Sequence, residues 1–483
     1  MNNEQFRAAA YALIDRIVTY REELASKTPP VLSKKEPGEI LRALPTVAPE
    51  QPENLAAVLQ DLDEHVFSGV MHWQHPRFFG YFPVGGGLAS VLAAIVTNGL
   101  GVIGLNWQSA PALTEIETAV MVWMRDLLGL SSAWNGVIQD SASSSAVVAL
   151  ICARERTTAY SAAAGGLQAE STALTVYTTA EAHSSVVKAA TLAGFGHDNV
   201  RLVETDADFS MNTQALQAAI SEDRAAGKRP CAIVATVGTT STTAVDPIEA
   251  IAAIAVREGI WLHVDSAMAG SAMLAPEFRH YWQGLESADS LVVNAHKWMT
   301  MAPECSFYFV RDAEHLVRVM STNPSYLRTD VDGEVINYRD WGIPLGRTFR
   351  ALKVWLTLRL EGADALRQRI RRDCGNTAWL AQQVDATDAW ERVAPAPFQT
   401  ICLIHKPLGL EGEALDAHTL DWCRQINNSG FAYLTPAIVG ERWIVRVSVG
   451  SELMEREDVE ALWEVMRKTA EDSAHAHTAK IIS

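Results

Sequence analysis

The chain has 483 residues, 48% of them hydrophobic and 20% charged, which is typical of a globular protein with more than one hydrophobic core. The formal net charge is −17, and the sequence contains no block rich in lysine and arginine. This charge balance disfavours nucleic acid and anionic membranes as partners, although a local site could still bind an anionic small molecule.

The six cysteines are scattered and form no CxxC pair. This pattern predicts reduced thiols in a cytoplasmic protein, not a disulfide framework or a metal site. The first residues, MNNEQFRAAAYALIDR, include acidic side chains and no uninterrupted apolar run, so we expect no signal peptide. The apolar run at residues 88–97 is too short to span a bilayer.

The N-terminal segment is predicted to be an amphipathic helix. Its apolar residues recur at helical spacing from Phe6 to Val18, and Pro29 and Pro30 end the pattern. The apolar stripe needs a partner surface, for which another subunit is one possibility. A second helix is expected near residues 53–70, followed by an aromatic and glycine-rich loop, HWQHPRFFGYFPVGGG, at 72–87.

From residue 88 to residue 310 the sequence alternates helical patterns, such as 247–258, with short apolar runs. Six strands are expected, at residues 173–178, 200–203, 231–237, 261–264, 290–294 and 306–310. Most of these runs are continuously apolar, which indicates strands buried on both faces of a largely parallel sheet. Ligands of such sheets bind at the carboxyl edge of the strands.

The last third of the chain begins with a polar stretch, NPSYLRTDVDGEVINYRDWG, at residues 323–342. Its lack of periodicity predicts a mobile, functional loop. A helical region is expected from residue 347 to residue 384. A small α+β domain should follow, with strands at 400–405 and 443–449 and helices at 415–427 and 456–469.

Lys297 and Asp265 carry the sharpest chemical signal. Lys297, in NAHKW, lies just past the strand at 290–294, where a lysine taken alone is most often a solvated loop residue. Asp265, in WLHVD, ends an apolar strand at the same sheet edge and needs a partner for its carboxylate. An arginine, a helix N-terminus or a protonated pyridine nitrogen would each be a suitable partner for this carboxylate. A lysine Schiff base with an aspartate on the ring nitrogen is the arrangement of a pyridoxal-phosphate site.

Two further segments fit such a cofactor. The segment at 136–156 predicts a strand, a serine-rich turn and a helix, which places Ser141 and Ser143 at a helix N-terminus, where anions bind. Plain N-capping explains the same serines, and Asp140 counts against a phosphate at this point. His183 follows the strand at 173–178 and could be an ordinary capping or core histidine, or could stack on the cofactor ring.

Seven motifs occur in a fixed order: HPRFFGYFP, SASSS, EAHSSVVKA, VATVGTTSTTAVDP, WLHVDSAMAGSA, ADSLVVNAHKW and YRDWGIPLGRTFRALKVW. Together they resemble the group II pyridoxal-phosphate decarboxylases, specifically the aromatic-L-amino-acid decarboxylases, over roughly residues 5–470. The resemblance implies the type I, aspartate-aminotransferase-like α/β fold, with a mostly parallel sheet, helices on both faces and a small C-terminal α+β domain. It also implies a homodimer with shared active sites, residues 1–85 as a helical dimerisation segment, 86–370 as the cofactor domain and 371–483 as the small domain.

The resemblance also assigns roles to residues. Lys297 would form the Schiff base, Asp265 would hold the ring nitrogen and His183 would stack on the ring. Tyr338, on a loop completed by the neighbouring subunit, would protonate the substrate Cα. The remaining cofactor contacts would be Ser141, Ala142, Ser143, Thr240, Ala267, Asn294 and His296.

The implied substrate pocket is apolar and contains Trp73, Tyr81, Phe82 and Pro83, with Ile103 and Leu105 contributed across the subunit interface. The sequence departs from the familiar animal enzymes at four positions. Val84 replaces a hydroxyl residue, Leu105 an aromatic residue, Met268 a tyrosine and Asp140 a glycine. These departures leave the ring preference open among dopa, tryptophan, 5-hydroxytryptophan, tyrosine and phenylalanine.

The expected activity is that of a carboxy-lyase, which converts an aromatic L-amino acid to its amine and carbon dioxide. An aromatic aldehyde synthase is the nearest alternative, but many such enzymes lack the loop tyrosine or the stacking histidine, and both residues are present here. A decarboxylase of acidic amino acids would need a cation near the substrate, and the loop at 72–87 supplies only Arg77. A non-catalytic protein that binds the cofactor is disfavoured by the complete set of Lys297, Asp265, His183 and Tyr338.

Overall fold

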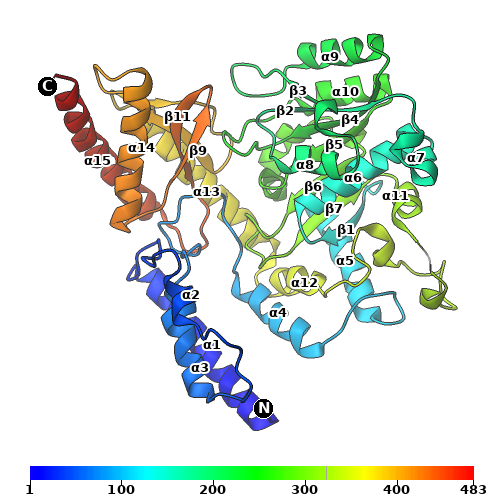
Figure 1. The fold of residues 1–483 in the computed structure, drawn as a ribbon, viewed down its shortest axis with the longest axis horizontal. Helices are drawn as coiled ribbons and strands as arrows, with labels where there is room; N and C mark the ends of the chain where they lie inside the picture. The colour runs from blue at the N-terminus through cyan, green and yellow to red at the C-terminus, as the bar shows by residue number, and fades with distance from the viewer. Residues whose placement is uncertain (323, 483) are drawn as a thin grey trace. The chain divides into compact units, whose positions relative to one another are not determined.

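Figure 1 shows a computed structural model of the chain, which describes residues 1–322 and 324–482, with side chains up to residue 477. Residue 323, the first of the predicted mobile loop, lies outside the described residues. Internal contacts divide the chain into two units. The larger unit contains Val84–Ala381 and Arg392–Cys402, and the smaller unit contains Met1–Pro83, Gln382–Glu391 and Leu403–Ser483.

The larger unit is built on a seven-stranded sheet with the order β1-β7-β6-β5-β4-β2-β3 (Figure 1). Its strands are β1 (Asn135–Gln139), β2 (Leu174–Thr179), β3 (Val200–Val203), β4 (Arg229–Thr236), β5 (Trp261–Asp265), β6 (Ser290–Asn294) and β7 (Ser306–Val310). Neighbouring strands from β3 to β6 are parallel, and β7 runs antiparallel to both β6 and β1. The prediction of a mostly parallel sheet is therefore confirmed.

Both faces of this sheet are covered, because every residue of β2, β5, β6 and β7 is buried and successive side chains point to opposite faces. The helices of the unit are α4 (Leu88–Leu100), α5 (Pro111–Leu128), α6 (Ala142–Thr157), α7 (Ser161–Gly165), α8 (Ser185–Leu192), α9 (Thr213–Ala225), α10 (Ile248–Glu258), α11 (Ala313–Met320), α12 (Ala351–Leu360) and, as far as Ala381, α13 (Gly362–Asp385). The helical region expected from residue 347 therefore begins at Ala351 and is broken at Gly362, where φ is +82°.

Short 3-10 helices connect these elements. They are η2 (Leu167–Ala169), η3 (His197–Asn199), η4 (Ala269–Leu274), η5 (Pro276–Trp282), η6 (Leu285–Ser287), η7 (Ser325–Leu327) and η8 (Tyr338–Trp341). The predicted mobile loop therefore contains two short helical turns, η7 and η8. Among the described residues, no helix is both long enough and apolar enough to cross a membrane.

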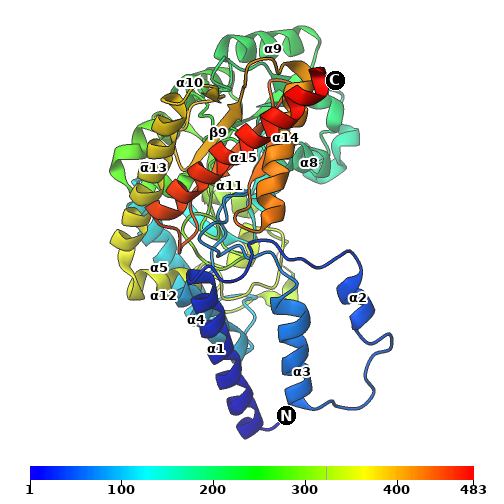
Figure 2. The same cartoon turned by 90° about the vertical axis from the view of Figure 1, so that its left-hand side faces the viewer.

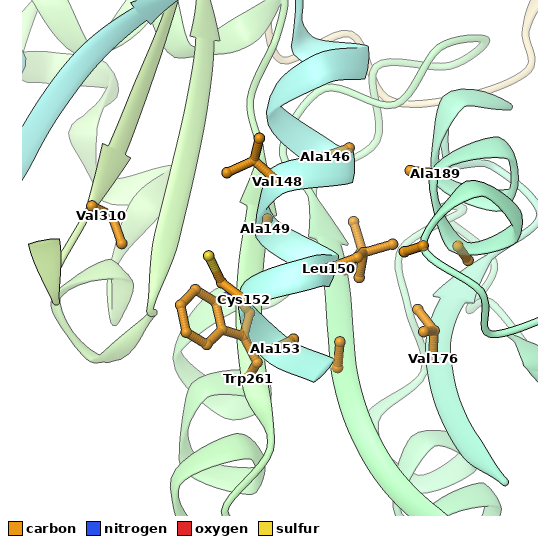
Figure 3. Close-up of a cluster of buried hydrophobic side chains, with 14 of the residues drawn as sticks. Ala146, Val148, Ala149, Leu150, Cys152, Ala153, Val176, Ala189, Trp261 and Val310 are labelled. Atoms are coloured by element: carbon orange, nitrogen blue, oxygen red, sulfur yellow. The ribbon is translucent and has the colours of Figure 1, made fainter. Parts of the chain in front are cut away.

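Helix α6 lies within a cluster of buried hydrophobic side chains (Figure 3). Its small residues Ala146, Ala149 and Ala153 allow close packing, while Val148, Leu150 and Cys152 fill the space around it. Partners come from the strands, including Val176 of β2, Trp261 of β5 and Val310 of β7, and from Ala189 of α8. This packing fixes the N-terminal end of α6, where the predicted phosphate-binding serines lie.

All six cysteines are free. Cys152 and Cys231 belong to the core around α6, and Cys305 directly precedes β7. Burial raises the pKa of the Cys152, Cys231 and Cys305 thiols to about 12. These thiols therefore serve as packing groups in the folded chain.

The second sheet has the order β10-β11-β9-β8, with β8 (Trp390–Arg392), β9 (Thr400–His405), β10 (Thr435–Val439) and β11 (Arg442–Ser448). Strands β10 and β11 form an antiparallel hairpin whose two turn residues, Gly440 and Glu441, have φ of +55° and +66°. Both values suit a type I′ turn. Helices α14 (Gly412–Ser429) and α15 (Arg456–Ile482) lie side by side (Figure 2), so the predicted α+β character of this region is confirmed.

The N-terminal part of the smaller unit contains α1 (Asn3–Ala25), α2 (Glu39–Ala43), α3 (Leu55–Asp61) and a π-helix, η1 (Leu62–Phe67) (Figure 2). A capping box between Asn2 and Gln5 begins α1. Near its other end the ring of Tyr20 lies 5.5 Å from the rings of Phe67 and His72. Phe6 and Val18 of the predicted apolar stripe are exposed, as is Tyr11. The second predicted helix is present as α3 and η1 and ends at Phe67.

Candidate active site

Asp265 and Asn294 end two adjacent parallel strands, so both lie at the carboxyl edge of the sheet. Asp265 is 6% exposed, and its Oδ1 atom accepts a hydrogen bond of 3.0 Å from the Ala267 backbone N–H. The backbone N–H of Asn294 donates to the Ala267 carbonyl over 3.0 Å. The structure therefore brings together three predicted cofactor residues, Asp265, Ala267 and Asn294.

Lys297 lies in a tight turn immediately after β6. Its backbone N–H donates to the Asn294 carbonyl at 3.1 Å, and its carbonyl accepts from the Thr300 N–H at 3.2 Å. The side chain is half-buried beside the fully buried Trp298, whose indole N–H donates to the Asp373 carboxylate at 2.9 Å. Neighbours with fixed hydrogen bonds thus hold the backbone of Lys297 in place, as a reacting amine requires.

His183 lies between β2 and α8, close to both Lys297 and Asp265. Burial lowers the pKa of His183, the positive charge of Lys297 lowers it further, and the negative charge of Asp265 partly opposes these two effects. Since β2, β4, β5 and β6 are parallel neighbours in the sheet, His183, which follows β2, lies at the same carboxyl edge as Asp265 and Lys297. The Nδ1 atom of His183 also accepts from the Ser185 backbone N–H at 3.1 Å, so the ring caps α8 as well.

His296 and Asn294 have structural partners near the start of β7. The Cys305 N–H donates to Nδ1 of His296 at 3.1 Å, and the Ser306 hydroxyl donates to Oδ1 of Asn294 at 2.6 Å. The pKa of His296 is lowered to about 4, mainly by burial and to a smaller extent by the positive charge of Lys297. His296 is therefore a neutral imidazole beside Lys297 at neutral pH.

Thr240 lies in a compact turn after β4. The turn is closed by a hydrogen bond from the Gly238 N–H to the Ala244 carbonyl at 2.9 Å, and the Val237 N–H donates to the Asp265 carbonyl at 3.0 Å. Gly238 has φ of +86°, and an added Cβ would lie 2.6 Å from Cβ of Ala269. Met268, which the sequence comparison singled out, is buried against this glycine. Only glycine fits this close approach between the turn and η4.

The serine-rich turn forms the N-terminus of α6. Ser141 is the N-cap, and its hydroxyl accepts from the Ser144 N–H at 3.3 Å. Ala142 and Ser143 occupy the first helical positions, whose N–H groups have no partner within the helix. Oδ2 of Asp140 accepts from the hydroxyls of Ser141 (3.2 Å) and Ser144 (2.9 Å). The N-terminus of α6 is therefore capped by Ser141 and lies beside the carboxylate of Asp140.

Tyr338 begins η8 and is buried against α5, where its hydroxyl lies 3.1 Å from the Thr118 hydroxyl. Its ring lies 5.5 Å from the ring of Trp341 and 5.2 Å from the Arg347 guanidinium. Burial raises the pKa of the Tyr338 phenol, which is therefore protonated at neutral pH. These contacts join Tyr338 to α5 and to its own loop; none of them is with Lys297 or His183, so its catalytic role stays a prediction.

A buried ion pair beside Tyr338 escaped the sequence analysis. Arg347 donates to both carboxylate oxygens of the fully buried Glu117, at 2.9 and 2.6 Å, and also to the Ile138 carbonyl at 2.7 Å. The Ile138 N–H donates to Glu117 in turn, at 2.9 Å. No local pattern identifies such a pair, because its members are 230 residues apart.

Of the predicted substrate residues, Trp73, Tyr81, Phe82 and Pro83 belong to the smaller unit. Trp73 stacks on Tyr81, with ring centroids 5.4 Å apart, and the Arg446 guanidinium lies 4.9 Å from the Phe82 ring. Pro83 approaches Gly450, at which an added Cβ would lie 2.7 Å from the proline ring. The sequence analysis missed Tyr433, which joins this group from the β10 side of the unit and carried no motif.

Ile103 and Leu105 belong to the larger unit, where they flank Gly104. Gly104 forms two backbone hydrogen bonds with Arg347, of 2.8 and 3.1 Å. Ile103 is exposed and Leu105 is half-buried. Their predicted role across a subunit interface stays a prediction.

The α/β sheet and the cluster of lysine, aspartate and histidine at its carboxyl edge define an enzyme of the pyridoxal-phosphate-dependent class. Residues 37–406 match the model of the pyridoxal-dependent decarboxylase conserved domain. The chain therefore belongs to the pyridoxal-dependent decarboxylase family, whose cofactor is pyridoxal phosphate and whose members are carboxy-lyases.

Similar proteins cover almost the whole chain. A phenylacetaldehyde synthase of Arabidopsis thaliana is 36% identical and covers 98% of this chain and 98% of its own length. An aromatic-L-amino-acid decarboxylase of Catharanthus roseus is also 36% identical, over 97% of this chain and 94% of its own. The crystal structure of Oryza sativa TDC with pyridoxal phosphate and tryptamine has a TM-score of 0.94 at 32% identity, covering 98% of this chain and 99% of that one.

Proposed function

We propose that the chain decarboxylates an aromatic L-amino acid to the corresponding amine and carbon dioxide. The observation that carries the proposal is the convergence of Lys297, Asp265 and His183 at the sheet edge of a pyridoxal-dependent decarboxylase. Relatives whose names specify aromatic substrates support the aromatic class. Within the smaller unit, the predicted substrate residues Trp73 and Tyr81 stack on each other.

The residues at the sheet edge fit pyridoxal phosphate by their chemistry. A half-buried amine, a buried carboxylate and a neutral imidazole lie together, and a helix N-terminus with two serine hydroxyls lies in the same unit. When bound, the cofactor supplies an electron sink that stabilises negative charge on the substrate Cα as carbon dioxide departs. Ser141, Ala142, Ser143, Thr240, Ala267, Asn294 and His296 would hold its phosphate and ring.

Each catalytic side chain then has a distinct task. The Lys297 amine would hold the cofactor covalently and carry a proton on Nζ during product release. The carboxylate of Asp265 would keep a proton on the ring nitrogen, since burial strengthens the attraction between unlike charges. The neutral ring of His183 would stack on the cofactor face and keep it in register. These groups act most strongly on the transition state, in which charge develops.

Tyr338 would deliver the proton to the substrate Cα. Its phenol is protonated at neutral pH and can therefore donate a proton. In the described conformation its hydroxyl bonds to Thr118, so the loop must move before Tyr338 can act. We infer that a second subunit completes the site with this loop, in a homodimer with shared active sites.

Two alternative activities are less well supported. An aldehyde synthase activity is supported by two similar proteins of that name. Against it, many such enzymes lack the loop tyrosine or the stacking histidine, whereas this chain contains both Tyr338 and His183. A decarboxylase of acidic amino acids would use Arg77. The guanidinium of Arg77 lies over the Phe431 ring at 4.0 Å and 3.5 Å from the Asp458 carboxylate, so its charge is already partnered.

The proposed setting is the cytoplasm. All six cysteines are free, which is expected of a protein in a reducing compartment. The net charge of −17 argues against nucleic acid as a partner.

A substrate panel tests the proposal. The protein loaded with pyridoxal phosphate is incubated separately with dopa, tyrosine, phenylalanine, tryptophan, 5-hydroxytryptophan and glutamate, and carbon dioxide, amine, aldehyde and hydrogen peroxide are measured. We expect amine and carbon dioxide in equal amounts from at least one aromatic substrate, without peroxide. Aldehyde with peroxide would establish the synthase instead, and turnover of glutamate alone would overturn the aromatic assignment.

A further inference from the structure

Two side chains of α13 form hydrogen bonds with the turn that carries Lys297. Nη1 of Arg369 donates to the Thr300 hydroxyl at 2.7 Å. The Asp373 carboxylate accepts from the Trp298 indole N–H at 2.9 Å. Arg369 and Asp373, both in the larger unit, are four residues apart and so lie on one face of the helix. The turn is therefore fixed to α13 at the first and third residues after Lys297.

The contact with Asp373 is deeply buried. Asp373 is 0% exposed and Trp298 is 1% exposed. The second carboxylate oxygen of Asp373 accepts from Nε and Nη2 of Arg372, at 3.0 and 2.9 Å. Burial raises the pKa of Asp373 to about 6, so the carboxylate is ionised at pH 8. Because a hydrogen bond to an ionised acceptor is stronger than one between neutral groups, the indole is held firmly against α13.

The contact with Arg369 involves a strained residue. Thr300 has φ of +59°, in the left-handed region that a β-branched residue rarely occupies. It is 3% exposed, and its backbone N–H donates to the Lys297 carbonyl at 3.2 Å. Strained residues persist only where the surrounding structure holds them, and they are common at functional sites. The surrounding contacts, including the bond from Arg369, therefore impose the shape of this turn on the chain.

We propose that Arg369 and Asp373 are positioning residues, which hold the turn so that the amine of Lys297 attaches readily to pyridoxal phosphate. The inference rests on the proposed role of Lys297 and goes beyond it, because it gives a task to a helix that carries no predicted site residue. A lysine side chain is long and flexible, so the position of its backbone has to be fixed within about 0.5 Å for the amine to react efficiently. Each residue would act through its hydrogen bond to the turn.

A comparison of two forms of the cofactor isolates the position of the lysine. Pyridoxal phosphate attaches covalently to a lysine, whereas pyridoxamine phosphate, which lacks the aldehyde, binds without attachment. Trp298→Phe and Thr300→Val each remove one of the two hydrogen bonds. In each variant the Kd of pyridoxal phosphate, measured by titration calorimetry at pH 8, should rise about fivefold or more, the scale of one lost hydrogen bond. The Kd of pyridoxamine phosphate should stay unchanged.

Variants of α13 test the same two contacts from the helix. Arg369→Met should have the same effect as Thr300→Val. Asp373→Leu should have the same effect as Trp298→Phe. A double variant that changes both partners of one bond should bind no more weakly than either single variant, because the two residues act through that bond. The variants of Arg369 and Thr300 decide the outcome if the loss of the buried carboxylate prevents Asp373→Leu from folding.

Three matched controls accompany these variants. Thr300→Ser keeps the hydroxyl and should restore the wild-type affinity that Thr300→Val loses. Arg371→Met removes an exposed arginine of the same helix, which pairs with Glu277 at 2.6 Å. Trp261→Phe removes a buried indole bond to Ser290, of 3.0 Å, at the start of β5. The last two variants should leave the affinities for both forms of the cofactor unchanged.

The outcomes distinguish the proposal from a general loss of stability. An equal rise of both dissociation constants, or a rise in Trp261→Phe as large as that in Trp298→Phe, would overturn the proposal. Unchanged constants in Trp298→Phe would overturn the role of Asp373, and unchanged constants in Thr300→Val would overturn the role of Arg369. If Lys297→Ala binds pyridoxal phosphate as tightly as the wild type does, the proposed function of Lys297 itself fails.

Discussion

At the scale of single residues, Asp140 is the unexpected member of the predicted phosphate site. Its carboxylate accepts hydrogen bonds from Ser141 and Ser144 at the N-terminus of α6. A helix N-terminus stabilises negative charge, so the carboxylate is well placed in the free protein. A phosphate at the same helix end would meet a like charge and would compete for the same hydroxyls.

Replacing Asp140 with Asn should therefore tighten cofactor binding. Two unit charges about 6 Å apart at an effective dielectric of about 40 repel by roughly 1.4 kcal/mol, which is tenfold in affinity. We expect the Kd of pyridoxal phosphate, measured by absorbance titration, to fall about tenfold in Asp140→Asn. Pyridoxal, which lacks the phosphate, should bind the variant and the wild type equally. Equal affinities for pyridoxal phosphate would place the phosphate away from α6.

Lys297 is the residue on which covalent attachment depends. Lys297→Ala should bind pyridoxal phosphate without the visible absorbance of the lysine-linked cofactor, and its activity should fall at least about a thousandfold. The exposed Lys188 of α8 provides a matched control, since Lys188→Ala should keep both the spectrum and the activity. A visible band that persists in Lys297→Ala would assign the linkage to another lysine.

At the scale of secondary-structure elements, the pair of Glu117 and Arg347 joins α5, β1 and the segment after η8. Arg347→Met should destabilise the fold by about 3–5 kcal/mol, because Glu117 would be left buried without a countercharge. Arg347→Lys keeps the positive charge but cannot donate to both Glu117 oxygens in the same way, so it should destabilise the fold less than Arg347→Met does. Urea unfolding measures both, and a loss below about 1 kcal/mol in Arg347→Met would show that the pair is not needed for stability.

Helices α14 and α15 and strand β9 share a buried histidine pair. Nδ1 of His405 lies 2.9 Å from Nε2 of His418, and Nδ1 of His418 lies 3.1 Å from the Ser473 hydroxyl, which donates to Asp421 at 3.0 Å. Burial lowers the pKa of both histidines to about 4. The nearby charges are those of Asp421 and of His477 when it is protonated.

This pair should make the fold sensitive to mild acid. Because the folded pKa lies below the unfolded value of about 6.5, the unfolded chain takes up protons first, so stability is complete above pH 6.5 and falls as the pH drops towards 4. Between pH 7.5 and pH 4.5, the free energy of unfolding measured in urea should fall by about 2 kcal/mol less in His418→Gln than in the wild type. Parallel stability curves for the two proteins would refute this origin of the acid sensitivity.

The elements also show which features a single sequence predicts. β3, β6 and β7 have the predicted bounds, because each is a short, mainly apolar run between turn residues, although only β6 and β7 are buried throughout. β8 and β10 were missed: β8 has three residues, and four of the five residues of β10 are not buried, so neither gives an apolar run. Pairing with neighbouring strands, a non-local effect, forms both.

The residues of the candidate site also differ in whether a local sequence pattern predicts them. Lys297 and His183 follow strand ends and Asp265 ends a strand, so the sequence predicts that all three lie at one sheet edge, while their roles came from the family resemblance. Tyr433 and the pair of Glu117 and Arg347 act through partners more than 200 residues away in the sequence, and a single sequence records no such contact. The conformation of Tyr338 depends on Thr118 in the same way.

At the scale of the whole molecule, exposed apolar side chains indicate where a second subunit would bind. α4 exposes Leu88, Leu92, Ile95 and Val96, and α1 exposes Phe6, Tyr11 and Val18. Apolar residues grouped in this way on a helix usually mark a protein–protein interface. They support the proposed homodimer.

Sedimentation should therefore give twice the chain mass of 52.7 kDa. The double variant Leu92→Glu/Ile95→Glu places charges on the exposed face of α4 and should yield monomers with little activity, because the proposed sites are shared. Leu192→Glu changes an exposed leucine on α8 and should leave the dimer intact. A dimer that survives the double variant would show that α4 lies outside the interface.

The burial of Cys152, Cys231 and Cys305 has a practical consequence. Because these side chains are buried and their pKa values are raised to about 12, they stay in the thiol form, and we expect iodoacetamide, which reacts with the thiolate, not to label them while the chain is folded. Alkylation at each position must wait until the surrounding segment opens. Mass spectrometry of the labelled peptides over time would then report how often α6, β4 and the segment before β7 open in solution, without any engineered probe.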